Sequence, residues 1–167
     1  RREIKEMKIS RDTKRSERRK KNIPSVAIAG YTNAGKSSLL NRLTGADVLV
    51  ENALFATLDP TVRKTESADG RIYTLVDTVG FVRHLPHQLV EAFKSTLEEV
   101  SEADLIVHVV DGSHPDPFEQ LRAVREVINE IGGGEIMEII AVNKADVASP
   151  EVLMEILRKE SNAYAIS

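Results

Sequence analysis

Two glycines five residues apart are followed at once by a lysine and a serine. The segment Gly30-Tyr31-Thr32-Asn33-Ala34-Gly35-Lys36-Ser37 matches the pattern G-x-x-x-x-G-K-[ST]. Glycine permits a tight turn whose backbone N–H groups surround a phosphate. The lysine would reach the β- and γ-phosphates of a nucleotide, and the serine hydroxyl would bind Mg²⁺. The segment predicts a phosphate-binding loop, and we expect the next residue, Ser38, to join it in holding the nucleotide.

A second short pattern, Asp77-Thr78-Val79-Gly80, follows the apolar segment 72–76. An aspartate at the end of a strand beside a phosphate-binding loop can hold Mg²⁺, usually through water. The glycine three residues later lets its backbone N–H meet the γ-phosphate. D-x-x-G is a weak pattern alone and becomes informative because it follows the first pattern and a strand. It predicts Asp77 as a metal residue and Gly80 as a phosphate contact.

A third pattern, Asn143-Lys144-Ala145-Asp146, follows the apolar segment 136–142. A carboxylate here can accept hydrogen bonds from both N1–H and the 2-amino group of guanine. Adenine has no N1–H and would leave the carboxylate unpaired. The alternative is an Asn/Asp pair that caps a helix. Near the C-terminus, Ser167 lies where a backbone contact to the guanine O6 is expected.

A long segment of weak periodicity, residues 51–61, separates the first two patterns and contains Thr57 and Thr61. A threonine that reaches Mg²⁺ only when the γ-phosphate is present would make this segment a switch. Both threonines qualify from the sequence, and either could be an ordinary loop or strand residue.

These patterns need elements that bring them together. Strands are predicted near 25–29, 62–68, 72–76, 104–110, 136–142 and 162–166, and helices near 36–43, 88–100, 118–130 and 150–160. Ala68-Asp69-Gly70-Arg71 predicts a hairpin turn between the second and third strands. Alternation with one hairpin predicts an α/β fold: a six-stranded, mostly parallel sheet with one antiparallel edge strand and helices on both faces. The ligand is then expected at the carboxyl ends of the strands.

The composition excludes several protein classes. The chain has 167 residues, of which 41% are hydrophobic and 29% charged, a balance typical of one globular domain. No apolar run approaches the roughly 18 residues that cross a bilayer. Cysteine is absent, which excludes disulfides and thiolate chemistry and fits a cytoplasmic protein.

Charge divides the chain into two parts. Residues 1–22 contain eleven Lys/Arg and four Asp/Glu, a net charge of +7, whereas the remainder carries −10. We expect 1–22 to be a basic helical linker, the end of a truncated N-terminal region, and 23–167 to be a GTP-binding domain truncated at its C-terminal end. A basic arm suggests a polyanionic partner; the alternative is a solvated charged helix.

The patterns occur in the order found in Ras-like GTP-binding domains. Beyond them, the segments FATLDPT, DTVGFVRHLP, HQLVEAFKSTLEEV and ADLIVHVVDGSHPD and the preceding basic helix closely resemble the HflX family of ribosome-associated GTPases. The resemblance covers essentially all of residues 1–167, but not the N-terminal domain of that family. It favours Thr57 over Thr61 as the switch residue.

The resemblance implies hydrolysis of GTP to GDP and phosphate with Mg²⁺, with Lys36, Thr57 and Gly80 at the reacting phosphate and Ser37, Thr57 and Asp77 at the metal. It further implies binding to the large ribosomal subunit and dissociation or rescue of ribosomes under stress. A cytoplasmic monomer, associated in part with membranes and without a membrane span, is expected.

Phe81 stands where many Ras-like enzymes have the glutamine that orients the attacking water. A phenyl ring has no suitable hydrogen-bonding group, so slow intrinsic turnover with outside help is expected. The nearby His84 and His87 could reach the water or could be solvent-facing loop residues. Asn33 is a candidate K⁺ ligand beside the phosphates, or a turn-forming residue. His108 is expected to pack within a strand.

Three functions compete. The first is a ribosome-stimulated GTPase. The second is a slow GTP/GDP switch whose output is binding to rRNA or protein. The third is another class of P-loop kinase or ATPase, against which Asn143-Lys144-Ala145-Asp146 argues.

Overall fold

The computed structural model describes residues 13, 16, 23–31, 33–45, 61–78 and 94–167. Its strands are β1 (Ser25–Gly30), β2 (Thr61–Glu66), β3 (Ile72–Asp77), β4 (Leu105–Asp111), β5 (Met137–Asn143) and β6 (Ala163–Ala165). Its helices are α2 (Lys36–Thr44), α4 (Lys94–Ser101), α5 (Pro117–Glu130) and α6 (Pro150–Lys159). The predicted alternation is confirmed wherever the chain is described.

The described strands form one six-stranded sheet in the order β2-β3-β1-β4-β5-β6. Only β2 runs antiparallel to its neighbour, with Thr61 opposite Asp77 and Glu66 opposite Ile72. The predicted six-stranded sheet with one antiparallel edge strand is therefore confirmed. Both edges are short or charged: β2 carries Arg63 and Lys64, and β6 has three residues.

The hairpin between β2 and β3 closes as its sequence predicts. The backbone N–H of Gly70 donates to the carbonyl of Ser67 at 2.9 Å, and that of Ser67 donates to the carbonyl of Arg71 at 2.8 Å. Gly70 has φ 83, a left-handed conformation that glycine adopts without a Cβ clash.

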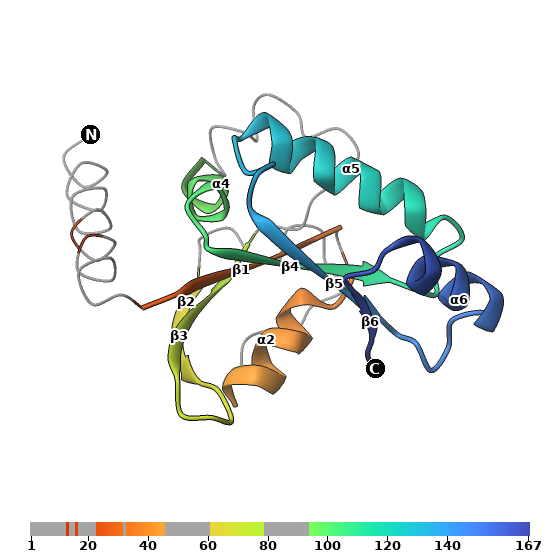
Figure 1. The fold of residues 1–167 in the computed structure, drawn as a ribbon, viewed down its shortest axis with the longest axis horizontal. Helices are drawn as coiled ribbons and strands as arrows, with labels where there is room; N and C mark the ends of the chain where they lie inside the picture. The colour runs from red at the N-terminus through yellow and green to blue at the C-terminus, as the bar shows by residue number, and fades with distance from the viewer. Residues whose placement is uncertain (1–12, 14–15, 17–22, 32, 46–60, 79–93) are drawn as a thin grey trace.

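Helices cover both faces of the sheet (Figure 1). On one face α4 and α5 pack on Ala27, Ala29 and Ile106, and α5 and α6 pack on Val110, Ile140 and Val142. On the other face α2 places the fully buried Leu40 against Ile28 and Leu75. Strand residues therefore alternate between two apolar layers, as a mostly parallel sheet requires.

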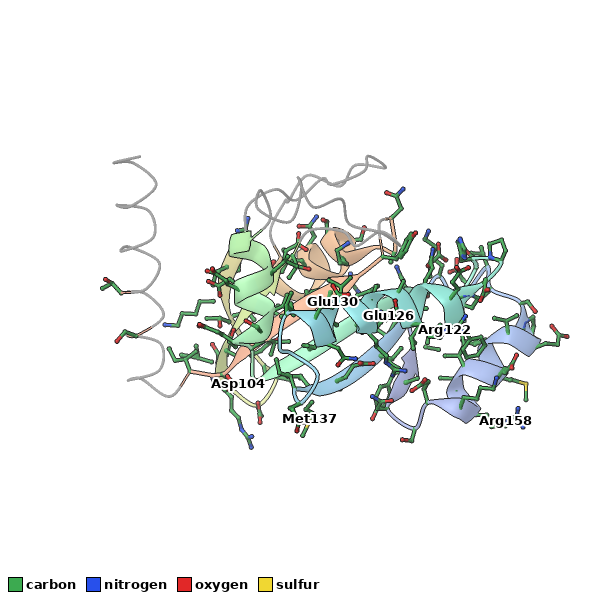
Figure 2. All side chains as sticks on the ribbon, turned by 90° about the horizontal axis from the view of Figure 1, so that it is seen from above. Asp104, Arg122, Glu126, Glu130, Met137 and Arg158 are labelled. Atoms are coloured by element: carbon green, nitrogen blue, oxygen red, sulfur yellow. The ribbon has the colours of Figure 1, made fainter. Side chains whose placement is uncertain are left out.

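Helix α5 shows its two faces in its sequence. Leu121, Val124 and Ile128 are buried against the sheet, one or two turns apart. Arg122, Glu126 and Glu130, each one turn from the next, lie along the outer face (Figure 2). The helix begins at Pro117, and the Asp116 carboxylate accepts a hydrogen bond from the backbone N–H of Glu119 at 3.0 Å. Proline in the first turn and an aspartate N-cap fix its start.

The first part of the predicted helix 88–100 and nearly all of the basic linker 1–22 lie outside the described residues. The described part of the predicted helix is α4. In the linker only Thr13 and Ser16 are described, and both are helical and exposed. None of the described helices is long and apolar enough to cross a membrane.

Candidate nucleotide-binding site

The predicted phosphate-binding loop joins β1 to α2, at the carboxyl edge of the sheet. Its backbone turns through two left-handed residues, Asn33 with φ 64 and Gly35 with φ 100. A Cβ on Gly30 would lie 2.5 Å from the carbonyl oxygen of Val109 on the adjacent strand β4. The first glycine therefore permits close packing, and the second permits the turn that opens α2. Among loop residues, Thr32 lies outside the described part.

Lys36 begins α2 with only 8% of its surface exposed. Burial lowers the pKa of its ammonium group, and the nearby Asp77 carboxylate opposes that effect. A partly desolvated cation at a helix N-terminus is suited to an anionic ligand, because the anion would stabilise the charged ammonium group in place of the water that burial removes.

Ser37 and Asp77 come together from two elements. The Ser37 hydroxyl lies 3.4 Å from a carboxylate oxygen of Asp77, which is fully buried at the end of β3. Next to it, the Thr78 hydroxyl donates to the carbonyl of Ile28 at 2.7 Å and fixes the end of β3 on β1. A serine hydroxyl and a carboxylate are oxygen ligands of the kind Mg²⁺ prefers, so these residues fit the predicted metal role.

The third pattern contacts the first directly. The Asn143 side-chain amide donates to the carbonyl of Ala34 at 3.0 Å. The Lys144 ammonium lies 3.3 Å from the carbonyl of Asn33, and Lys144 itself has a left-handed backbone with φ 58. Two consecutive loop carbonyls are thus held by two consecutive residues from the end of β5.

Asp146 is exposed just beyond this contact. The chain after β6 runs alongside: the backbone N–H of Ala145 donates to the carbonyl of Ile166 at 3.1 Å, and the N–H of Ile166 donates to the carbonyl of Val142 at 2.9 Å. Ile166 is therefore bonded to this loop, and Ser167, the predicted second base contact, is the next residue along the chain.

Several predicted site residues lie outside the described part of the chain: Thr57, Gly80, Phe81, His84 and His87. Of the two candidate threonines, Thr61 is the first residue of β2 and pairs with Asp77 in register. Its backbone therefore belongs to a strand beside the candidate metal ligand Asp77, and the role of Thr57 stays a prediction.

The histidines differ in their surroundings. His108, on β4, is 1% exposed, and its Nδ1 lies 3.7 Å from a carboxylate oxygen of Glu138, so the predicted burial within a strand is confirmed. His114 accepts a hydrogen bond at Nδ1 from the backbone N–H of Asp116 at 3.0 Å. With Tyr31 and Gln120, His114 lines a cavity of about 180 Å³ between the phosphate-binding loop and α5.

Asp111, the last residue of β4, is a polar residue of this site that sequence reasoning missed. Its carboxylate lies 2.8 Å from the Lys144 ammonium. Burial opposes its ionisation, but hydrogen bonds from Lys144 and Ser113 outweigh burial and lower the pKa of Asp111. An aspartate at the carboxyl end of an apolar strand, in VVDGS, was the available signal.

Comparison with known proteins agrees with this geometry. Residues 25–144 match a family described as 50S ribosome-binding GTPase. The chain is 55% identical over 144 residues to a GTPase HflX from Caldanaerobacter subterraneus, which covers 86% of this chain and 34% of that protein. It is 48% identical over 137 residues to GTPase HflX from Escherichia coli, covering 82% of this chain and 32% of that protein. The chain thus spans about a third of the length of these relatives.

Solved structures share the fold. A GTP-binding protein from Sulfolobus solfataricus in complex with GDP aligns with a TM-score of 0.66 and 29% identity over 98% of this chain and 55% of its own. Aquifex aeolicus Era bound to GDP·AlF4⁻ aligns with a TM-score of 0.70 and 21% identity over 87% of this chain and 51% of its own. The family match covers most of the chain and includes the phosphate-binding loop, Asp77 and Asn143. The chain belongs to the 50S ribosome-binding GTPase family, and the resemblance to HflX predicted from its sequence is confirmed.

Proposed function

We propose that this chain binds GTP with Mg²⁺ and hydrolyses it to GDP and phosphate in the cytoplasm, in association with the large ribosomal subunit. The observation that carries the nucleotide part is the contact between Asn143 and Ala34. It joins a phosphate-binding loop to a guanine-type N-K-x-D segment. This combination favours GTP over ATP, because the Asp146 carboxylate would find both of its hydrogen-bond donors on guanine and not on adenine.

Each residue has a chemical task in the proposed reaction. Lys36 and the N-terminus of α2 would bind the β- and γ-phosphates and stabilise charge that develops on them. Ser37 and Asp77 would hold Mg²⁺, with Thr57 completing the set in the GTP state. Mg²⁺, when bound, would neutralise charge on the β- and γ-phosphate oxygens. The backbone N–H of Gly80 would donate a hydrogen bond to the γ-phosphate, so that the conformation of the following segment would depend on whether GTP or GDP is bound.

Turnover is expected to be slow without a partner. Phe81 offers no hydrogen bond to a water molecule, so the group that orients it has to come from another part of this chain or from a partner. This sequence feature also favours a second function, a GTP/GDP switch whose output is binding to rRNA or protein and whose hydrolysis only resets it. The two functions differ in turnover number on the ribosome.

Base recognition provides the first experiment. In Asp146→Asn the side chain presents an amide to the base in place of a carboxylate, so it cannot accept both guanine donors. We expect the affinity for GTP and GDP to fall by about one hundred-fold, while xanthosine nucleotides, whose C2 carbonyl accepts a hydrogen bond, bind better than they do to the wild type. Titration with fluorescent nucleotides measures both affinities.

Asp69→Asn is the matched control, because Asp69 is an exposed carboxylate of the β2–β3 hairpin. It should leave both affinities unchanged. Wild-type protein that prefers ATP, or an Asp146→Asn variant with unaltered base preference, would overturn the proposal.

A further inference from the structure

The lysine of the N-K-x-D segment is held from two sides. Its ammonium group lies 2.8 Å from Oδ2 of Asp111 and 3.3 Å from the carbonyl oxygen of Asn33. Asp111 ends β4, Lys144 follows β5, and Asn33 belongs to the phosphate-binding loop after β1. Lys144 therefore connects the ends of three strands, and Asp111 is the anion in that connection.

The Asp111 carboxylate is itself fixed. Its Oδ1 accepts hydrogen bonds from the Ser113 backbone N–H at 2.9 Å and from the Ser113 hydroxyl at 2.6 Å. Asp111 pairs with Asn143 in the parallel ladder, and the N–H of Gly112 donates to the carbonyl of Asn143 at 2.9 Å. Oδ1 of Asp111 thus accepts hydrogen bonds from Ser113 in the following turn, and Oδ2 accepts the one from Lys144.

The connection acts mainly through geometry. The Lys144 side chain is 40% exposed and that of Asp111 16% exposed. An ion pair of this exposure contributes little to the free energy of unfolding on its own. The backbone of Lys144, however, has φ 58, which an L-residue adopts only where its surroundings hold it. Asn33, whose carbonyl Lys144 contacts, is left-handed as well, with φ 64.

We propose that Asp111 is a positioning residue, which holds Lys144 against the phosphate-binding loop and thereby sets the affinity for guanine nucleotide. This inference rests on the proposed nucleotide binding. With Asp111 in place, Lys144 keeps Asn33 in its turn while Asn143 holds Ala34, so the loop has its binding shape before a nucleotide arrives. Without Asp111, the Lys144 ammonium group would no longer be held beside the loop and would turn towards solvent. Ordering of the loop would then take place on nucleotide binding, which lowers the affinity.

The test replaces Asp111 and follows nucleotide dissociation. In Asp111→Ala we expect the dissociation constant of a fluorescent GDP analogue to rise about ten-fold or more, mainly through faster dissociation. Asp111→Asn, which keeps the side-chain shape and the hydrogen bond from Ser113, guards against a folding defect and should show a smaller rise in the same direction. Thermal unfolding without nucleotide reports the fold of both variants.

Asp104→Ala is the matched control. Its carboxylate accepts a hydrogen bond from the Ser25 backbone N–H at 2.8 Å, at the amino ends of β1 and β4 and thus opposite the carboxyl ends that carry the site (Figure 2). Its loss should lower the unfolding temperature without changing the dissociation constant.

A double-mutant cycle separates positioning from a general loss of structure. Because Asp111 acts through Lys144, Asp111→Ala should add little to the effect of Lys144→Met, so the two losses are not additive. Additive losses, or a dissociation constant for Asp111→Ala within two-fold of the wild type, would overturn the inference. Wild-type protein that binds no guanine nucleotide would instead overturn the proposed function, which distinguishes the two failures.

Discussion

At Gly35 the backbone of the phosphate-binding loop passes close to the side chain of Asn143. A Cβ at this position would lie 2.2 Å from the Asn143 amide nitrogen, and the backbone has φ 100. Gly35→Ala should therefore push Asn143 away from the carbonyl of Ala34 and strain the turn. We expect the affinity for GTP to fall about one hundred-fold, equivalent to about 3 kcal/mol, in a fluorescence titration.

Gly45→Ala tests whether that loss reflects the site. Gly45 ends α2 with φ 66, but a Cβ there meets nothing within 4 Å. Its replacement should cost about 1 kcal/mol in the free energy of unfolding and leave GTP affinity unchanged. Equal losses of affinity in the two variants would contradict the explanation.

Asn33 is the residue for which two explanations remain. Its left-handed backbone accounts for an asparagine by itself, and the K⁺ role suggested by the sequence is the second explanation for its exposed side chain. If it holds K⁺, GTP turnover should be about ten-fold faster in KCl than in NaCl at equal ionic strength. Asn33→Gly keeps the turn and should remove that difference. Equal rates in the two salts in the wild type would exclude the K⁺ role.

At the scale of elements, Arg125 joins α5, β5 and the end of α6. Its guanidinium bonds Glu138 at 2.8 Å and Glu160 at 3.0 Å. Burial of Glu138 disfavours its ionised form, but the neighbouring His108 and Arg125 outweigh burial and lower the pKa of Glu138 to about 2. The Arg125 contacts, at 2.8 and 3.2 Å, are within hydrogen-bond distance, whereas His108 is 3.7 Å away, so we assign most of the effect to Arg125.

The acid stability of the chain should depend on this group. The pKa of Glu138 is lowered in the folded state, so its contribution is present above the unfolded pKa, near 4.5, and is lost as pH falls from there towards 2. Arg125→Met should remove on the order of 1–3 kcal/mol from the free energy of unfolding at pH 7 and flatten its pH dependence between 4.5 and 2. Denaturant unfolding at a series of pH values measures both.

Arg71→Met is the control for Arg125→Met. The ion pair of Arg71 with Asp69 is 2.9 Å long but strongly exposed, at 85% and 56%. Its loss should leave the free energy of unfolding almost unchanged, because solvent screens so exposed a pair. A parallel loss of acid stability in both variants would show that the Arg125 contacts have no special role.

At the scale of the whole molecule, the sequence predicts the helices and strands better than it predicts which side chains of different strands contact one another. The strand–helix alternation, the hairpin at Asp69-Gly70 and the start of α2 follow from local patterns. That Asp111 lies beside Asn143 depends on β4 and β5 pairing in a particular register. The order of the elements along the chain does not determine this register, so the contact between Lys144 and Asp111 could not be predicted from the sequence. The same holds for His108 and Glu138, since the contact joins two strands through tertiary packing.

The proposed ribosomal role is tested with the whole chain, including its basic residues 1–22. If the ribosome supplies what Phe81 lacks, GTP turnover should rise about ten-fold or more when large ribosomal subunits are added, and less so at high salt. Lys36→Met, which removes the cation proposed to bind the phosphates, should show no turnover and controls for other GTPases in the ribosome preparation. Unchanged turnover with intact GTP binding would favour the slow switch.

The two edges of the sheet have a consequence for how copies of the chain behave together. A second copy that approached β2 would bring Arg63 and Lys64 towards an identical pair of cations, and β6 offers only three residues for pairing. Edge strands of this kind resist the addition of further strands. Both described edges of the sheet therefore disfavour pairing with a strand of a second copy.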